Sequence, residues 1–261
     1  MLTLKKIDVY LIAGQSNAVG CTKTSTLPSD FKGETFDKVY LYQEGNFCPT
    51  YYGKLIKGVH LGMGCNEDHM GIEYGIAKYI QEHSDNEAVL IRYGYGGSNA
   101  YLDWQPSPLW KDSPTFIGQY GFHYKTWAQT VVNGLSLLIK NGFLPVIKGV
   151  AWMQGESDAD KSQQIAEDYY ENLCNLIYTM RTELRLPQLP FAIGEISTKC
   201  DVAPWADVVR QAQRKFTETD KNAVLVETKD IPAGADGLHY DGLEDLALGL
   251  KFGEALMSFN K

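Results

Sequence analysis

Short apolar runs alternate with longer stretches of helical periodicity along the 261-residue chain. The runs are rich in β-branched residues and end at glycines or polar turns, which is typical of buried strands. They lie at residues 7–12, 39–42, 88–93, 146–153, 191–196 and 223–227. The helical stretches lie at residues 71–83, 122–140, 162–184, 205–216 and 242–259. Strands that alternate with helices form βαβ units, so the pattern predicts an α/β fold whose mostly parallel sheet is covered on both faces.

The chain is long for one domain but within the range of α/β folds, and it contains no repeat or low-complexity linker. We therefore expect a single domain over residues 1–261. The net charge is −8 and there is no long basic run, which argues against nucleic acid or a membrane surface as the partner. The sequence leaves the oligomeric state open.

Cysteine usage and the amino terminus both favour a cytoplasmic protein. No CxxC pair occurs, so neither a disulfide framework nor a zinc ribbon is indicated. The five cysteines are Cys21, Cys48, Cys65, Cys174 and Cys200. His60 and His69 match no familiar metal-ligand spacing, and we expect neither a metal nor a cofactor. No signal-peptide core precedes the first strand, although a leader could have been removed, and no apolar run is long enough to span a bilayer.

The first expected strand stops at Gly14, and Ser16 follows two residues later. Glycine permits a sharp turn there, and ligands of open α/β sheets bind at the carboxyl ends of the strands. Ser16 is therefore a candidate nucleophile, although most serines at such positions only cap a helix or a turn.

Asp236 and His239 lie three residues apart in a glycine-bearing turn, DGLH. At this offset the carboxylate can hold one imidazole nitrogen while the other faces a serine. A histidine pKa of roughly 6.5 suits a general base near neutral pH. The alternative is a surface histidine near the start of a helix.

Two further strands end in residues that could stabilise an oxyanion. Gly96 and Gly97 offer backbone N–H groups after one strand, and Gln154 offers a side-chain amide after another. Each alone is usually only a turn or a cap. Together with a serine and a base they would complete an acyl-transfer site.

These motifs carry a family resemblance. GQSN at 14–17 resembles the first block of the SGNH (GDSL-like) hydrolases, and specifically of their branch of sialate O-acetylesterases and acetylxylan esterases. WMQGESD at 152–158 is similar to that branch's WxQGE(S/T)D block, and DGLH at 236–239 fits its DxxH block. YGGS at 95–98 with Trp104 matches the second block, whereas MGIE at 70–73 departs from FGPE at its first and third positions.

The resemblance implies a three-layer α/β/α sandwich, flavodoxin-like, around a parallel sheet of about five strands. It implies Ser16 as the nucleophile, His239 as the base and Asp236 as the acid that orients it. The oxyanion hole would be the backbone N–H groups of Ser16 and Gly97 with the Gln154 side chain. Glu156 would brace the site, or only anchor its loop by hydrogen bonds.

The implied reaction is the hydrolysis of O-acetyl esters on sugars through an acyl-enzyme, without a cofactor. Tyr101, Trp104 and Trp110 could offer aromatic faces to a sugar ring, unless these rings pack the loop onto the core. The rivals are a general small-ester esterase or lipase and a non-catalytic carbohydrate-binding protein on the same fold. GQSNA at 14–18 is one residue short of the lipase motif G-x-S-x-G, but α/β-hydrolases place the nucleophile after several strands.

Overall fold

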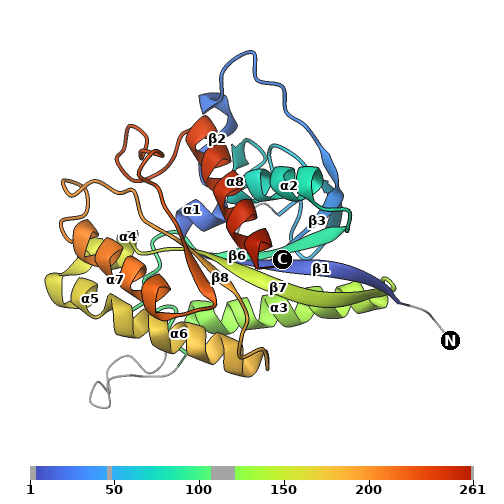
Figure 1. Ribbon diagram of the computed structural model, residues 1–261. Coiled ribbons are helices and arrows are strands. Elements are labelled where there is room, and N and C mark those ends of the chain that lie inside the picture. Colours follow the sequence, from blue (N-terminus) through green and yellow to red (C-terminus); the bar gives the residue numbers. More distant parts are fainter. Residues whose placement is uncertain (1–3, 46–48, 107–120, 260–261) are drawn as a thin grey trace.

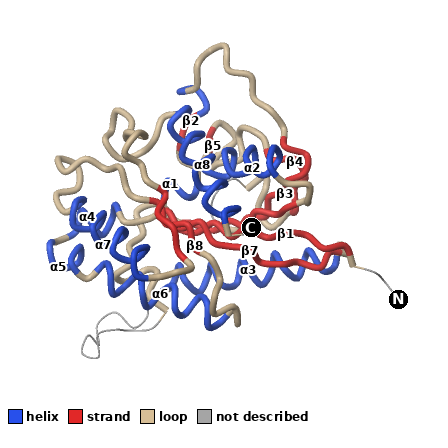
Figure 2. Tube along the Cα trace, viewed as in Figure 1, coloured by secondary structure: helices blue, strands red, loops and turns tan. Residues whose placement is uncertain are grey.

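The computed structural model describes residues 4–45, 49–106 and 121–259. Its centre is a sheet of seven strands in the order β4-β3-β6-β1-β7-β8-β9. Figures 1 and 2 show this sheet between helices. The strands are β1 (Lys5–Gly14), β3 (Phe36–Gln43), β4 (Leu55–Val59), β6 (Ala88–Gly94), β7 (Phe143–Met153), β8 (Phe191–Gly194) and β9 (Ala223–Val226). All neighbours pair in parallel except β3 and β4, which are antiparallel. The mostly parallel α/β fold is thus confirmed.

The expected number of about five strands is wrong, because six parallel strands and one antiparallel strand form the described sheet. The additional strand β4 lies in a stretch without clear periodicity. It is an edge strand that pairs only with β3, and Gly58 within it has a positive φ of 85°. An edge strand buries no regular set of alternate side chains, so its sequence carries little signal. A separate small sheet pairs β2 (Thr22–Lys23) with β5 (His69–Met70).

Helices cover both faces of the central sheet (Figure 1). α2 (Ile72–His83) and α8 (Gly242–Ser258) lie on one face, and α3 (Phe122–Lys140) and α6 (Tyr169–Glu183) lie on the other. The close packing of α2 on α8 depends on glycine: a Cβ on Gly75 would come within 2.5 Å of the Leu246 carbonyl oxygen. Among the described residues, no helix combines the length and apolarity needed to cross a bilayer.

The helix expected over residues 162–184 is two helices, α5 (Gln163–Glu167) and α6, with Asp168 between them. A further short helix, α4 (Glu156–Lys161), precedes them, and α7 (Ala206–Thr219) packs against α6. Ser162 separates α4 from α5 in an extended conformation, and its side chain accepts a hydrogen bond from the Ile165 N–H at 3.3 Å. The break inside the expected helix is at Asp168, whose φ of −75° and ψ of −8° are still helical. The buried residues Ala166, Tyr169 and Leu173 therefore keep a helical spacing across it, and the pattern alone could not show the break.

The central strands end together at one edge of the sheet. Gly14 at the end of β1 pairs with Gly94 at the end of β6 and with Met153 at the end of β7. Three loops therefore leave the core side by side, from residues 15, 95 and 154 onward. This edge is where an open α/β sheet binds its ligands.

Candidate active site

Ser16 is the first residue of α1 (Ser16–Val19), directly beyond the turn at Gly14. Gly14 has a φ of 143°, and a Cβ there would lie 1.9 Å from the Met153 carbonyl oxygen. Only glycine fits between β1 and β7 at this point, and the chain can therefore turn sharply after the strand. Ser16 is 6% exposed and lines a cavity at the sheet edge.

The structure brings Ser16, His239 and Asp236 together in one chain of hydrogen bonds. The distance from His239 Nε2 to Ser16 Oγ is 3.0 Å, and from His239 Nδ1 to Asp236 Oδ2 it is 2.7 Å. With Nδ1–H donating to the carboxylate, Nε2 has a lone pair for the serine proton. This is the arrangement of a nucleophile, a base and an acid that orients the base.

Asp236 is fixed by the turn that it begins. Its Oδ1 accepts hydrogen bonds from the backbone N–H groups of Leu238 at 2.9 Å and His239 at 2.8 Å. Partial burial opposes ionisation, but these bonds and the bond from the His239 ring hold the pKa of the Asp236 carboxyl below its usual value. The carboxylate is therefore charged at neutral pH and holds one orientation of the imidazole.

Glu156 and Asn17 form a buried link behind these residues. Asn17 Nδ2 donates to Glu156 Oε1 at 2.7 Å and to the Leu238 carbonyl at 3.2 Å. One amide therefore connects the helix of Ser16, the loop after β7 and the turn of His239. Burial raises the pKa of the Glu156 carboxyl, against the hydrogen bond from Asn17 and the nearby His239. The arrangement favours the interpretation that Glu156 braces the site.

Gln154 lies behind the cavity rather than in its wall. It is fully buried, and its Nε2 is within hydrogen-bond distance of Asp158 Oδ2 (2.6 Å), the Ser98 carbonyl (3.1 Å) and Gln15 Oε1 (3.2 Å). Two amide protons facing three acceptors leave none for a substrate. The expectation that the Gln154 side chain donates directly to an oxyanion is therefore wrong for this arrangement.

The side-chain oxygen of Gln15, and not its nitrogen, takes part in these buried contacts. Its Oε1 faces the loop after β7, with Gln154 Nε2 at 3.2 Å, the Ser157 N–H at 3.3 Å and the Gly155 N–H at 3.5 Å. Within the described part of the chain these bonds reach only Oε1, which leaves the Nε2 amide group without an acceptor. Since Gln15 lines the cavity beside Ser16, that amide is available to a ligand.

The second glycine-bearing loop forms another part of the wall. Gly96 and Gly97 both line the cavity, and Gly97 has a positive φ of 72°. The loop is held by the Tyr95 N–H, which donates to the Gly14 carbonyl at 3.1 Å, and by Ser98, whose N–H donates back to the Tyr95 carbonyl at 3.2 Å. A backbone N–H held in this way can act as a preorganised donor.

The cavity has a volume of about 450 Å³. Its walls come from the segments after β1, β6, β7 and β8 and from the turn of His239. They consist of Gln15, Ser16, Gly96, Gly97, Glu156, Ser157, Asp160, Val202, Ala203, Leu238 and His239. Of these lining residues, the acids Glu156 and Asp160 carry carboxyl groups, and none is a lysine or an arginine.

Two of the aromatic residues expected to face a sugar do not have free faces at the cavity. Trp104 is fully buried: its Nε1 donates to Ser98 Oγ at 2.8 Å and its ring packs edge-on against Trp152 at 5.0 Å. The prediction of a sugar contact by Trp104 is therefore wrong, because its ring stabilises the loop from inside. Tyr101 is half-buried and does not line the cavity, and Trp110 lies outside the described residues.

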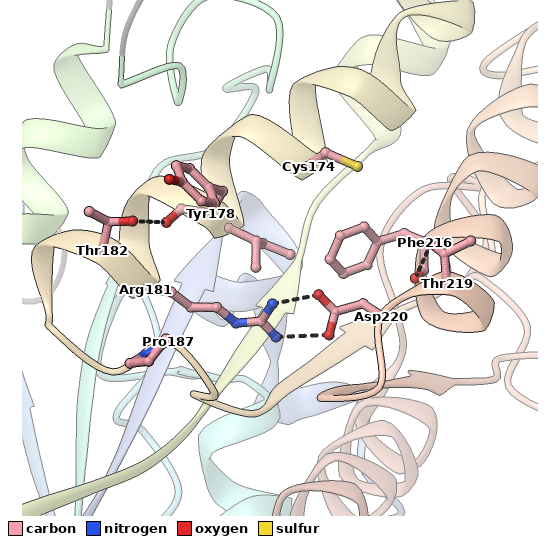
Figure 3. A pocket seen from close by; sticks show the side chains of 9 residues that line it. Cys174, Tyr178, Arg181, Thr182, Pro187, Phe216, Thr219 and Asp220 are labelled. Atoms are coloured by element: carbon pink, nitrogen blue, oxygen red, sulfur yellow. Dashed lines mark hydrogen bonds and ion pairs between the residues drawn. The ribbon is translucent and has the colours of Figure 1, made fainter.

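A second hollow, of about 280 Å³, lies between α6 and α7 on another part of the surface (Figure 3). Its one arginine, Arg181, faces Asp220 in the figure and also donates to the carbonyls of Leu189 at 3.0 Å and Asn222 at 3.3 Å. With its guanidinium occupied in this way, the hollow offers no free cation. Across the described ranges, no group of three or more His, Cys, Asp or Glu residues is placed to hold a metal ion.

Asn17, Gln15 and Asp158 were not identified as site residues from the sequence. Asp158 is fully buried and accepts from the Ala100 N–H at 2.8 Å and from Gln154, so it ties the second loop to the third. All three lie inside the motifs already singled out, at 14–17 and 152–158. Their presence in these motifs was the available signal, but the residue types do not show which way each side chain points.

Comparisons with known proteins identify the family and the fold. The family model described as "Carbohydrate esterase, sialic acid-specific acetylesterase" matches residues 6–258. A curated relative, a probable carbohydrate esterase from Arabidopsis thaliana, is 36% identical over 112 residues, which are 43% of this chain. The matched stretch spans only 41% of that relative.

Three solved structures resemble the fold. An Arabidopsis thaliana protein has a TM-score of 0.72 at 21% identity, with 97% of this chain and 98% of that chain covered. NanS has a TM-score of 0.69 at 14% identity, with 99% of each chain covered. A carbohydrate acetylesterase from Xanthomonas citri has a TM-score of 0.60 at 18% identity, with 97% of this chain and 56% of that chain covered. The likeness confirms the expected fold of the SGNH hydrolases.

Proposed function

The chain belongs to the carbohydrate esterase family of sialic acid-specific acetylesterases, and from that premise we propose that it removes acetyl groups from sugar hydroxyls. The observation that carries the proposal is the chain of hydrogen bonds from Ser16 Oγ through His239 to Asp236. It opens onto a cavity large enough for a sugar ring, about 450 Å³.

The reaction proceeds through an acetyl-enzyme. His239 Nε2 takes the Ser16 hydroxyl proton as Oγ forms a bond to the acetyl carbonyl carbon. The tetrahedral intermediate collapses when the C–O bond to the sugar breaks, and the leaving sugar oxygen receives the proton from His239. Water then attacks the acetyl-Ser16 carbonyl as His239 takes its proton. The bond from Ser16 Oγ to the acetyl carbon breaks, His239 returns the proton to Oγ, and acetate leaves.

The negative charge on the carbonyl oxygen needs donors in the cavity wall. The backbone N–H groups of Ser16 and Gly97 are two of the proposed donors. Gln15 is the proposed side-chain donor, because its amide nitrogen is free while Gln154 is committed behind it. Gln154 then acts through Gln15, by donating to its Oε1. A donor of this kind is typically worth about 10²–10³ in rate.

The charges of the cavity support a neutral sugar as the substrate. Glu156 and Asp160 line the wall, and the described lining residues include no lysine or arginine. A sialic acid carries a carboxylate that the charge of Asp160 would repel, whereas the hydroxyls of a neutral sugar would not be repelled.

Acetate release from a panel of esters tests both the acetylesterase activity and the preference for a neutral sugar. The panel comprises 4-nitrophenyl acetate, an acetylated xylo-oligosaccharide and a 9-O-acetylated sialic acid. We expect release from the first two, with kcat/KM for the neutral oligosaccharide above that for the sialic acid ester, and no release by Ser16→Ala. A preference for the sialic acid ester would refute the neutral-sugar assignment. If none of the three esters is cleaved, the result would favour the rival, a non-catalytic carbohydrate-binding protein.

A further inference from the structure

Cys21 and Cys65 are brought together by the backbone, at the far end of the helix that starts with Ser16. Gly20 ends this helix, and its N–H donates to the Ser16 carbonyl at 3.0 Å. The Gly20 carbonyl in turn accepts from the Cys65 N–H at 2.8 Å. This bond joins the peptide group just before Cys21 to Cys65 itself, so the two cysteine side chains leave neighbouring points of the backbone.

The backbone on either side holds the two cysteines in this register. The strands β2 and β5 pair next to them, with Thr22 opposite Met70. Gly64, the residue before the second cysteine, donates to the His69 carbonyl at 2.9 Å, and a Cβ on Gly64 would lie 2.4 Å from the Gly20 carbonyl oxygen. A disulfide needs its two Cα atoms close together, and this packing supplies that without refolding of either segment.

The two thiols are half-buried and contact each other through a hydrogen bond from Cys21 to Cys65. This bond lowers the pKa of Cys65 to about 6, against partial burial and with the help of the nearby His69 and Arg92. The same bond, and then burial, raise the pKa of Cys21. At neutral pH the pair therefore consists of one thiolate and one thiol, the two forms that disulfide formation uses.

We infer that Cys21 and Cys65 form a redox-active dithiol, which a hydroperoxide oxidises to a disulfide. The Cys65 sulfur attacks one peroxide oxygen: an S–O bond forms, the O–O bond breaks, and the leaving oxygen takes up a proton and departs as water. The Cys21 sulfur then attacks the Cys65 sulfur, so that the S–S bond forms, the S–O bond breaks, and a second water leaves with the Cys21 proton. Two thiols are oxidised and one hydrogen peroxide is reduced to two waters.

The disulfide would tie the residue after the nucleophile's helix to the segment that leads into β5. It would close a loop over residues 21–65, and such a cross-link stabilises a folded protein by restricting the unfolded chain. Neither cysteine lines the cavity of Ser16. The dithiol can therefore be tested by measurements that need no ester, and their outcome does not depend on the proposed function.

Peptide mapping after oxidation tests the pairing. The reduced protein would be treated with hydrogen peroxide, alkylated and digested with trypsin. We expect the peptides 7–23 and 58–78, which contain one cysteine each, to be joined and to separate on reduction. Cys21→Ser and Cys65→Ser should each abolish the joined peptide. Cys174→Ser is the matched control, because Cys174 is also half-buried but lies on α6, beside the second hollow (Figure 3), and it should leave the joined peptide intact.

Two further measurements on the wild type need no variant. Phenylarsine oxide bridges two adjacent thiols without oxidising them, so intact-mass analysis of the reduced protein should show one arsenical per chain, on Cys21 and Cys65. The unfolding temperature of the oxidised protein should exceed that of the reduced protein by about 5–10 °C, and dithiothreitol should reverse the shift.

Three results would overturn the dithiol. The first is recovery of Cys21 and Cys65 as alkylated thiols, or joined to other cysteines, after peroxide treatment. The second is a reduced wild type that does not bind the arsenical at this pair. The third is a lower unfolding temperature in the oxidised protein, because the folded backbone would then not accept the bond.

Discussion

Asn17 Nδ2 and Glu156 Oε1 lie 2.7 Å apart inside the protein, and their hydrogen bond joins the helix of the nucleophile to the loop after β7. The same nitrogen reaches the Leu238 carbonyl at 3.2 Å, next to the proposed base. The relative placement of Ser16 and His239, which are 223 residues apart in sequence, thus depends on one buried amide.

Asn17→Ala should therefore lower both the catalytic rate and the stability, although Asn17 itself does not take part in the reaction. Without the amide, Glu156 is a buried carboxyl group that has lost its donor, and the turn of His239 loses an anchor. We expect kcat for 4-nitrophenyl acetate to fall about tenfold to a hundredfold, as small misplacements of catalytic groups do. The free energy of unfolding in urea should fall by about 1–3 kcal/mol.

Asn133→Ala is the control for that variant. The Asn133 amide also holds a carboxylate, Glu44, at 3.0 Å, but it lies on α3 outside the cavity wall. It should leave kcat within about twofold of the wild type, because this contact lies away from the cavity wall. If Asn17→Ala affected kcat no more than Asn133→Ala, the positioning role of Asn17 would be wrong.

Gln15→Glu tests which glutamine faces the oxyanion. The carboxylate keeps an acceptor for the loop after β7 but loses the amide protons. We expect kcat to fall about 10²–10³ with a smaller change in KM. Gln154→Ala should reduce kcat less and lower the unfolding free energy more, because Gln154 is buried with three acceptors. The reverse order of kcat effects would return the donor role to Gln154.

Trp104→Ala should lower the free energy of unfolding, because Trp104 has a structural role and does not contact the substrate. Its ring is fully buried against Trp152 and Tyr93. Loss of such a ring costs about 3–5 kcal/mol of unfolding free energy, measured by urea denaturation. The exposed Tyr178→Ala should change it by less than about 0.5 kcal/mol. If Trp104→Ala were as stable as the wild type but had a raised KM for the oligosaccharide, Trp104 would contact the sugar after all, and its structural role would be wrong.

Asp245 on α8 should make the protein less stable as the pH rises. Burial, and then the nearby Glu73, raise the pKa of its carboxyl well above the usual value, against the pull of Arg92. The folded state therefore keeps a proton that the unfolded chain releases above about pH 4. In the pH range where Asp245 is protonated only in the folded state, this group lowers the free energy of unfolding by about 1.4 kcal/mol for each pH unit.

Asp245→Asn should remove that contribution and flatten the fall of the unfolding free energy as the pH rises above about 4, the usual pKa of an aspartate in the unfolded chain. Glu254→Gln, an exposed residue on the same helix, is the control and should leave the slope unchanged. An unaltered slope in Asp245→Asn would show that the buried carboxyl is ionised in the folded protein.

Much of the fold could be predicted from periodicity, and the reasons for the failures are physical. β1 and β6 are buried on both faces and are therefore continuous apolar runs, which makes them visible in the sequence. β4 is an edge strand with little burial to impose a pattern. The end of α3 could be placed because Asn141-Gly142 ends a helix by its local backbone preference.

The site could be predicted in its residue types but not in all of their directions. Ser16, Asp236 and His239 follow from local turns and from their order in the motifs. Gln154 and Trp104 were assigned to the substrate because each carries suitable chemistry after a strand. Their side chains point inward instead, where Asp158 and Ser98 meet their polar groups. Such partners come from tertiary packing, which one sequence does not contain.

The central claim is that Ser16 is the nucleophile, and covalent labelling tests it most directly. The protein would be treated with a fluorophosphonate, which phosphonylates only activated serines, and then analysed by intact-mass and peptide mass spectrometry. We expect one adduct per chain, on Ser16, with hydrolysis of 4-nitrophenyl acetate lost in step, and slow or no labelling of His239→Ala. An unmodified Ser16 in a protein that still hydrolyses the ester, or an adduct on another serine that abolishes activity, would contradict the account.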